Sequence, residues 1–195
     1  MIIYFDGAEY RQKNNVILSY GVLFHGGQEK PIETSGFYEL GRNMLGVHEE
    51  VAFVEAFLLL KKENISYKEV SFYSDSETLV NASFWLEEKN YVPSKKLFIE
   101  NIMKRVLKNI NKLEIFDEVM DCLKNSRFQK VKAHKKNTSI DNIRVDYLAK
   151  NYKKENILCY EEFLTCSFET FNNQGIPTLT NLPFMPKNKT HKIRV

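Results

Sequence analysis

Three strand-like segments follow one another at the start of the chain. They read MIIYFDGA at residues 1–8, NVILSYGVLFHGG at 15–27 and KPIETSGFYEL at 30–40, and short polar or glycine-containing turns join them. All three are rich in β-branched and aromatic residues, and the third alternates between apolar and polar positions. Strands joined by such short connections usually pair as an antiparallel meander. The first part of the chain therefore predicts one end of a β-sheet.

Helical and strand-like segments alternate after this meander. We expect a helix from about residue 47, a strand at 69–75, helices at 76–90, 95–111 and 113–125, a strand at 127–134 and a helix at 142–156. Ser76 is the predicted N-cap of the second helix. The resulting order, βββαβαααβα, predicts an α/β fold in which helices pack on the faces of a mixed sheet.

Four carboxylates fall near the ends of these elements. Asp6 lies in the first strand, Glu49 at the start of the first long helix, Asp75 at the end of the fourth strand and Asp146 early in the last helix. Each has an ordinary structural explanation as a turn, cap or surface residue when it is taken alone. Side chains at these places can nevertheless converge on one patch, and divalent cations such as Mg²⁺ offset the repulsion among such carboxylates.

Charge is unevenly distributed along the chain. Residues 1–93 hold 8 Lys and Arg against 14 Asp and Glu, whereas residues 94–195 hold 20 against 11. Basic residues are densest at 94–112 and 127–136, where they outnumber acids by six to one and five to none. Such clusters are typical of surfaces that contact a phosphate backbone, and a solvated basic face is the alternative.

Length and composition limit the class of protein. A chain of 195 residues, 43% of them hydrophobic, can build one sizeable core. No window approaches 18 consecutive apolar residues, and the first residues do not resemble a signal peptide. The three cysteines are widely spaced, which is typical of a reducing compartment. We therefore expect a soluble, cytoplasmic protein with no membrane partner, and a monomer.

Three motifs resemble those of type 1 ribonuclease H. They are YFDGA around Asp6, FYSDSETLVN around Asp75, and KVKAH followed by DNIRVDYLAK, in which Asn142 stands four residues before Asp146. The resemblance covers about residues 1–152, and we assign the catalytic domain to residues 1–153. It implies a ribonuclease H-like sheet of three antiparallel strands followed by two parallel strands, with helices on both faces.

The resemblance also implies an activity and a site. The expected reaction is two-metal-ion hydrolysis of the RNA strand of RNA/DNA hybrids, with two Mg²⁺ ions and Mn²⁺ as the alternative. Asp6, Glu49, Asp75 and Asp146 become the metal-binding catalytic acids, and Glu50 is an alternative to Glu49. His134 is expected on a loop beside the site, where its pKa would suit proton transfer.

Substrate contacts are expected from a basic protrusion and from the first strand. Many members of the family carry a basic protrusion where this chain has residues 94–112. The candidate phosphate contacts there are Lys95, Lys96, Lys104, Arg105, Lys108 and Lys112. The backbone of Gly7 is a further candidate, although Ala8 replaces a serine that often follows it. The paired asparagines common before the helix acid are also absent, since the chain reads NMLGVHEE with only Asn43 upstream.

Two other functions are also compatible with the sequence. A nuclease of the same fold that cuts double-stranded RNA or DNA would use the same acids, and a non-catalytic nucleic-acid-binding module would have lost one of them. Residues 154–195 are expected to form a helix and an extended basic tail. The tail's composition suits packing on the domain, nucleic-acid binding or docking of a partner protein, and the sequence does not choose among these.

Overall fold

The computed structural model describes residues 1–86, 93–131, 139–154, 157–165 and 167. The chain divides into two compact units, Met1–Ile157 and Leu158–Val195. The first unit holds the sheet, its helices and the predicted acids. In the second, residues 160–165 and 167 are helical, and the predicted basic tail lies outside the described residues.

The sheet has five strands in the order β3-β2-β1-β4-β5. β1 (Ile2–Arg11), β2 (Asn15–His25) and β3 (Ile32–Gly41) are antiparallel, which confirms the predicted meander. The short strands β4 (Ser71–Ser74) and β5 (Arg127–Lys130) run parallel to β1. The mixed sheet expected from the sequence is therefore present.

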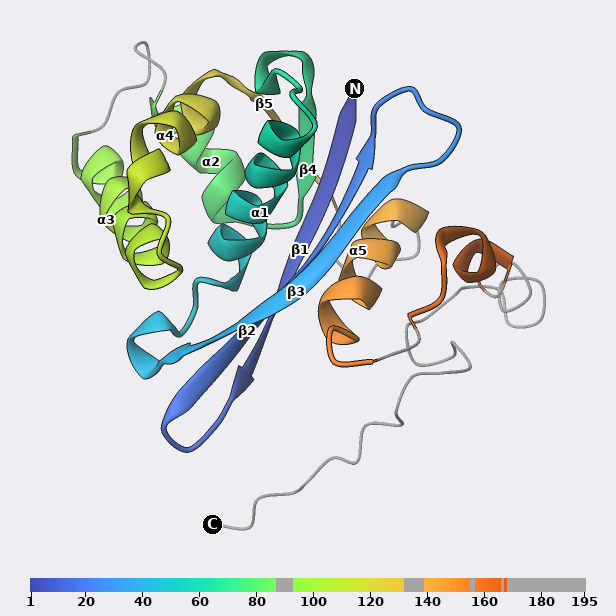
Figure 1. Cartoon of the computed structure of the whole chain (residues 1–195). Helices are drawn as coiled ribbons and strands as arrows, with labels where there is room; N and C mark the ends of the chain where they lie inside the picture. Colours follow the sequence, from blue (N-terminus) through green and yellow to red (C-terminus); the bar gives the residue numbers. More distant parts are fainter. Residues whose placement is uncertain (87–92, 132–138, 155–156, 166, 168–195) are drawn as a thin grey trace. The chain divides into compact units, whose positions relative to one another are not determined.

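Helices cover both faces of this sheet (Figure 1). α1 (His48–Lys62) packs on one face together with α2 (Glu77–Leu86), α3 (Pro93–Asn109) and α4 (Phe116–Asn125), and α5 (Ile140–Lys150) lies on the other. Short 3₁₀ turns precede α1, β4 and α4, at Arg42–Met44, Tyr67–Glu69 and Leu113–Ile115. None of the helices in the described ranges has the length and apolarity needed to cross a bilayer.

Two glycines allow α1 and α5 to approach the sheet closely. A Cβ atom at Gly7 would lie 2.3 Å from the backbone oxygen of His48 at the start of α1. One at Gly21 would lie 2.2 Å from the backbone oxygen of Val145 in α5. Because Asp6 pairs with Gly21 across β1 and β2, the side chain of Asp6 shares the α5 face, and that of Glu9 shares the α1 face with Gly7.

A group of aromatic rings lies in the core between the sheet and α1. Phe5, Phe53 and Phe72 are fully buried, and their rings contact one another with centroids 5.8 to 6.4 Å apart. Phe128 of β5 stacks on Phe72 at 5.0 Å. These contacts link β1, β4, β5 and α1, so the ends of these elements, where the predicted acids lie, are held in fixed relative positions.

Element ends differ from the expected boundaries in several places. Ser76 precedes α2 as predicted, and its hydroxyl accepts the Leu79 N–H at 3.4 Å. α5 begins at Ile140 rather than at residue 142, because the Ser139 side chain caps it by accepting the Asp141 N–H. It ends at Lys150 rather than at residue 156. Directly after Lys150, the side-chain amide of Asn151 donates to the Tyr147 carbonyl. Asp146 consequently lies in the middle of the helix.

Candidate active site

Three carboxylates from separate elements meet beside β1. They belong to Asp6 in β1, Glu49 in the first turn of α1 and Asp75 directly after β4. One oxygen of each lies within 4.8 Å of the others. β4 pairs with β1 only from Ile2 to Tyr4, so β1 continues past the end of β4 and carries Asp6 to the place where Asp75 leaves the sheet.

An open pocket of about 340 Å³ surrounds these acids. Its lining comes from β1, the start of α1, the end of β4 and α5. The lining residues are Asp6, Gly7, Ala8, Glu9, Tyr10, His48, Glu49, Asp75, Asp146 and Lys150. The four acids expected from the sequence therefore face one pocket, although they are distant along the chain.

Burial and mutual repulsion raise the pKa of two of the acids. The pKa of Asp6 lies well above its ordinary value, first because the group is buried and second because Asp146 and Asp75 are close. Burial, followed by the charges of Asp6 and Asp75, likewise raises the pKa of Glu49. A cation bound between these carboxyl groups would offset their repulsion.

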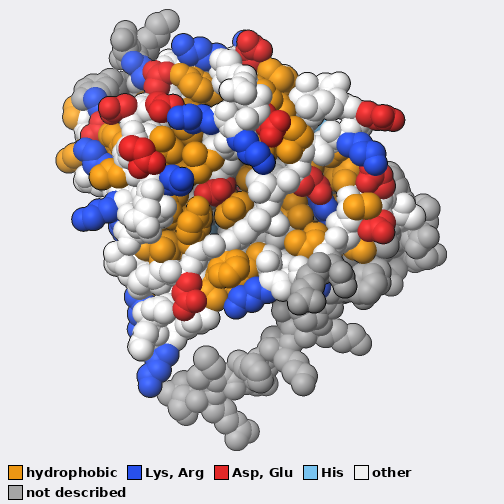
Figure 2. Space-filling model, viewed as in Figure 1, with side chains coloured by type: hydrophobic (Ala, Val, Ile, Leu, Met, Phe, Trp, Pro, Cys, Tyr) orange, Lys and Arg blue, Asp and Glu red, His pale blue; other side chains and the backbone are white. Residues whose placement is uncertain are grey.

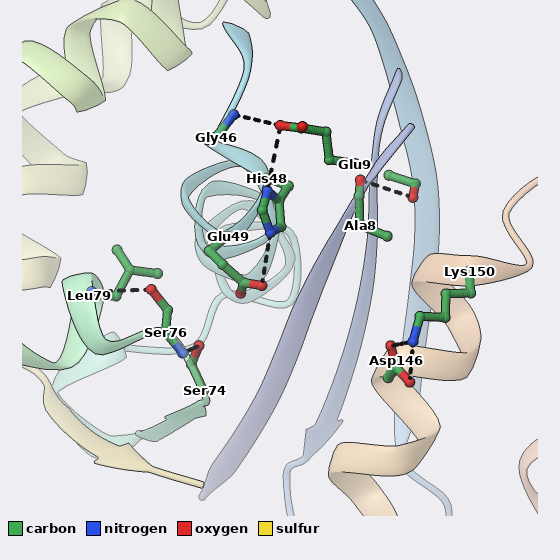
Figure 3. A network of polar contacts seen from close by, with 11 residues as sticks. Ala8, Glu9, Gly46, His48, Glu49, Ser74, Ser76, Leu79, Asp146 and Lys150 are labelled. Carbon is green, nitrogen blue, oxygen red and sulfur yellow. Dashed lines mark hydrogen bonds and ion pairs between the residues drawn. The ribbon is translucent and has the colours of Figure 1, made fainter. Parts of the chain in front are cut away.

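Asp146 lies in the same pocket but has a different partner. Its carboxylate oxygens are 2.6 and 2.9 Å from the ammonium group of Lys150, one helical turn further along α5. Figure 3 shows this ammonium pointing at the Asp146 carboxylate. The i, i+4 spacing places both side chains on one face of the helix. A lysine thus balances the charge on this wall of the pocket.

Glu49 and Glu50, the two alternatives for the helix acid, point in different directions. Glu49 joins Asp6 and Asp75 in the cluster, and its Oε2 atom is buried without a hydrogen-bond partner in the described part of the chain. Glu50 is also buried, but it does not line the pocket, and the positive charge that acts on it is that of Arg105 in α3. The geometry therefore places Glu49 at the site.

A polar bridge not anticipated from the sequence supports the start of α1. Glu9 accepts the Gly46 N–H at 2.5 Å, and Gly46 has a φ of +77° that glycine adopts without strain. His48 lies between two acids, with Nδ1 4.0 Å from Glu9 and Nε2 3.7 Å from Glu49 (Figure 3). Burial lowers the pKa of His48. The alternation of β1 puts Glu9 on the α1 face, and this was the signal available in the sequence.

The candidate phosphate-binding residues lie on and just after α3. Lys95, Lys104, Arg105 and Lys108 are exposed, whereas Lys96 and Lys112 are partly buried. Two of these side chains lie over aromatic rings, Lys95 at 4.7 Å from Trp85 and Lys104 at 5.0 Å from Phe116. On the face drawn in Figure 2, basic side chains over α3 and α4 are interspersed with acidic and hydrophobic ones.

Two other predicted residues have different outcomes. His134 lies outside the described residues, so its position relative to the acids stays a prediction. Gly7 lines the pocket, and the close approach of α1 leaves no room for a side chain there.

Comparisons with known proteins place this geometry in context. Residues 1–154 match the family model described as RNase H. Among solved structures, RNase H1 from the halophilic archaeon Halobacterium salinarum is 16% identical, with 77% of this chain and 95% of that chain covered and a TM-score of 0.48. LC11-RNase H1, solved in complex with an RNA/DNA hybrid, is 21% identical, with 75% and 91% covered and a TM-score of 0.43.

Curated relatives match at a similar level of identity. They are a subunit of eukaryotic translation initiation factor 3 from Drosophila yakuba and its counterpart from Drosophila ananassae. Each is 24% identical over 170 residues, which is 77% of this chain. The chain spans 24% of the length of either protein.

Proposed function

This chain belongs to the RNase H family, and from that premise we propose that it is an endonuclease that hydrolyses the RNA strand of RNA/DNA hybrids with two divalent cations. One observation carries the proposal: the carboxylates of Asp6, Glu49 and Asp75 have oxygens within 4.8 Å of one another in an open pocket. Three acids crowded in this way are costly without a cation. The family match over residues 1–154 gives the cluster its expected chemistry.

The donor set suits Mg²⁺ or Mn²⁺. All three clustered ligand atoms are carboxylate oxygens, which hard divalent cations prefer, and they lie in an open pocket. The Oε2 atom of Glu49 is a buried acceptor that a cation would satisfy. Bound there, such cations supply Lewis acidity and charge neutralisation at the phosphate.

Each residue of the pocket then has a proposed role. Asp6, Glu49, Asp75 and Asp146 would together hold the cations. Lys150 balances the charge of Asp146 and would compete with a cation for it. The bridge from Glu9 to Gly46 fixes the start of α1 and so orients Glu49. His134 stays the predicted group for proton transfer to the leaving oxygen.

The substrate follows from the groups around the pocket. A hybrid presents 2′-hydroxyls on one strand only, and these are read across a shallow minor groove. The backbone of Gly7 is open to the pocket, and the exposed Lys95, Lys104, Arg105 and Lys108 offer sequence-independent phosphate contacts. This combination favours a duplex recognised by its backbone.

Cleavage of strand-labelled substrates tests the proposal. The protein is mixed with an RNA/DNA hybrid, double-stranded RNA, single-stranded RNA and duplex DNA, in Mg²⁺ and in Mn²⁺, with Asp75→Asn as the inactive control. We expect cutting of the RNA strand of the hybrid alone, lost in the variant. Faster cutting of another duplex would keep the metal mechanism and overturn the substrate. Binding without cutting in either metal would leave a nucleic-acid-binding module.

A further inference from the structure

Three aromatic rings form a cluster on the α5 face of the sheet. They belong to Tyr10 near the end of β1, Phe37 in the edge strand β3 and Tyr152 just after α5. The Tyr152 centroid lies 5.5 Å from that of Tyr10 and 4.9 Å from that of Phe37. We call these three residues the aromatic cluster.

Two rings of the aromatic cluster are exposed to solvent. Phe37 is 46% exposed and Tyr10 is 37% exposed, unlike the other aromatic residues of the three antiparallel strands. Phe37 pairs with Ser19, whose hydroxyl donates to the Ala149 carbonyl in the last turn of α5. α5 ends at Lys150, so it covers Ser19 while Phe37 on the neighbouring strand stays exposed.

Positive charge accompanies the rings. The ammonium of Lys153 lies 5.6 Å from the Tyr152 centroid and 5.9 Å from that of Phe37. Aromatic rings with an adjacent cation bind nucleic acid by stacking on a base while the cation meets the neighbouring phosphate. A purely apolar protein-docking patch would gain nothing from this lysine.

The cluster is continuous with the active-site pocket. Tyr10 lines that pocket together with Asp6 and Asp146, and its hydroxyl donates to the Lys150 carbonyl at 3.3 Å. Lys150 in turn binds Asp146. A nucleic-acid strand with one phosphate at the carboxylates would therefore pass the aromatic cluster as it continues along the α5 face.

We propose that the aromatic cluster binds an unpaired nucleobase of a strand held at the carboxylates. This inference rests on the proposed function and specifies its substrate: a hybrid with a single-stranded nucleotide next to it, at a duplex end or junction. Bases inside a continuous duplex are stacked on their neighbours, so their faces are closed to protein rings, whereas an unpaired base can stack. The rings are held against one another, so little order is lost when the base binds.

Binding of matched hybrids tests this inference. In the Asp75→Asn protein, the dissociation constant is measured by fluorescence anisotropy for a blunt hybrid and for hybrids with a three-nucleotide extension, of either polarity and on either strand. One extension carries 2-aminopurine, whose fluorescence falls when it stacks. We expect at least one extension to tighten binding by about fivefold or more, with quenching of the base.

Ring-specific variants separate stacking from simple apolar contact. Phe37→Leu and Tyr152→Leu keep apolar bulk but remove the ring, and they should abolish the advantage of the extension. Phe37→Tyr and Tyr152→Phe should keep it. Leu113→Ala, which truncates another exposed hydrophobic side chain, should change nothing. Circular dichroism on each variant confirms that it is folded.

The outcomes separate this inference from the proposed function. Equal affinity for blunt and extended hybrids, or full retention of the advantage in Phe37→Leu, would overturn the stacking site even if the wild-type protein cuts hybrids. A change of mass in solution in Phe37→Leu, with unchanged nucleic-acid binding, would identify the surface as a contact between protein copies instead. Extension-dependent binding without any cleavage by the wild-type protein would uphold the site and overturn the enzyme.

Discussion

The acidic pocket and the basic helix α3 use charge in opposite ways. In the pocket, burial and the charges of neighbouring acids raise the pKa values of Asp6 and Glu49. On α3, Lys104 and Lys108 are exposed on long side chains, and Lys104 lies over the ring of Phe116. Fixed, desolvated charges interact strongly, whereas exposed, mobile ones are screened by water and salt. Single substitutions should therefore be decisive in the pocket and modest on α3.

The largest expected effect is the loss of Asp75. Asp75→Asn keeps the size of the side chain but removes a charged ligand, so cleavage of the hybrid should fall by more than about a hundredfold, since changes even to outer-shell partners of metal ligands cost 10- to 100-fold. Single-turnover cleavage in Mg²⁺ measures this. The matched control is Asp117→Asn, which removes an exposed acid at the start of α4 and should leave the rate unchanged. Equal rates for the two variants would show that Asp75 in the pocket matters no more than an exposed acid elsewhere.

Stability without metal should depend on pH through the pocket. Asp6 and Glu49 have raised pKa values in the folded protein, above ordinary values of 3.8 and 4.5. The folded state therefore binds more protons than the unfolded state between those values and the raised ones, and stability falls as pH rises through this window. Thermal unfolding in EDTA from pH 4 to 8 should show the decline.

Glu49→Gln tests which groups cause this decline. The variant removes one of the two acids with a raised pKa, so its melting temperature should fall less steeply with pH than that of the wild type. Glu114→Gln, at an exposed position before α4, should keep the wild-type slope. Saturating Mg²⁺ should also flatten the wild-type profile, because it stabilises the ionised acids. Parallel profiles for the wild type and Glu49→Gln would contradict the assignment.

A smaller effect is expected at Lys150, where the pocket supplies its own cation. Lys150→Met frees Asp146, so less Mg²⁺ should be needed for half-maximal cleavage, while the metal-free protein should melt at a lower temperature because a buried charge loses its partner. Titration of cleavage against Mg²⁺, together with melting in EDTA, measures both. Lys61→Met breaks an exposed ion pair with Glu118 and should alter neither. An increased Mg²⁺ requirement would show that Lys150 assists the cation rather than competes with it.

Much of the fold was readable in the sequence because local patterns agree with the tertiary arrangement. The meander follows from three strand-like segments with short turns, and Ser76 precedes α2 as predicted. The start of α5 was predicted two residues late because its N-cap is Ser139, which stands before the apolar spacing becomes visible. A single side chain decided that boundary, and periodicity does not detect such caps.

The site was only partly predictable. Motif spacing identified the four acids that face the pocket, and the i, i+4 spacing of Asp146 and Lys150 was visible in retrospect. To choose between Glu49 and Glu50, one must know how α1 is rotated about its axis. The close contact between Gly7 and the start of α1 sets this rotation. The aromatic cluster joins β1, β3 and the end of α5, so only the register of the strands brings its rings together.

The smallest expected effect belongs to α3 and tests the other half of the comparison. Lys104→Gln and Lys108→Gln should each weaken hybrid binding by less than about tenfold and lower the slope of log affinity against log salt by about 0.9, the value for one lost phosphate contact on a duplex. Binding by Asp75→Asn at several salt concentrations measures the slope. Lys68→Gln is the matched control, since Lys68 is an exposed lysine over a tyrosine ring away from α3. Unchanged slopes for all three variants would make α3 a solvated basic face, and binding would then depend on the pocket and the aromatic cluster.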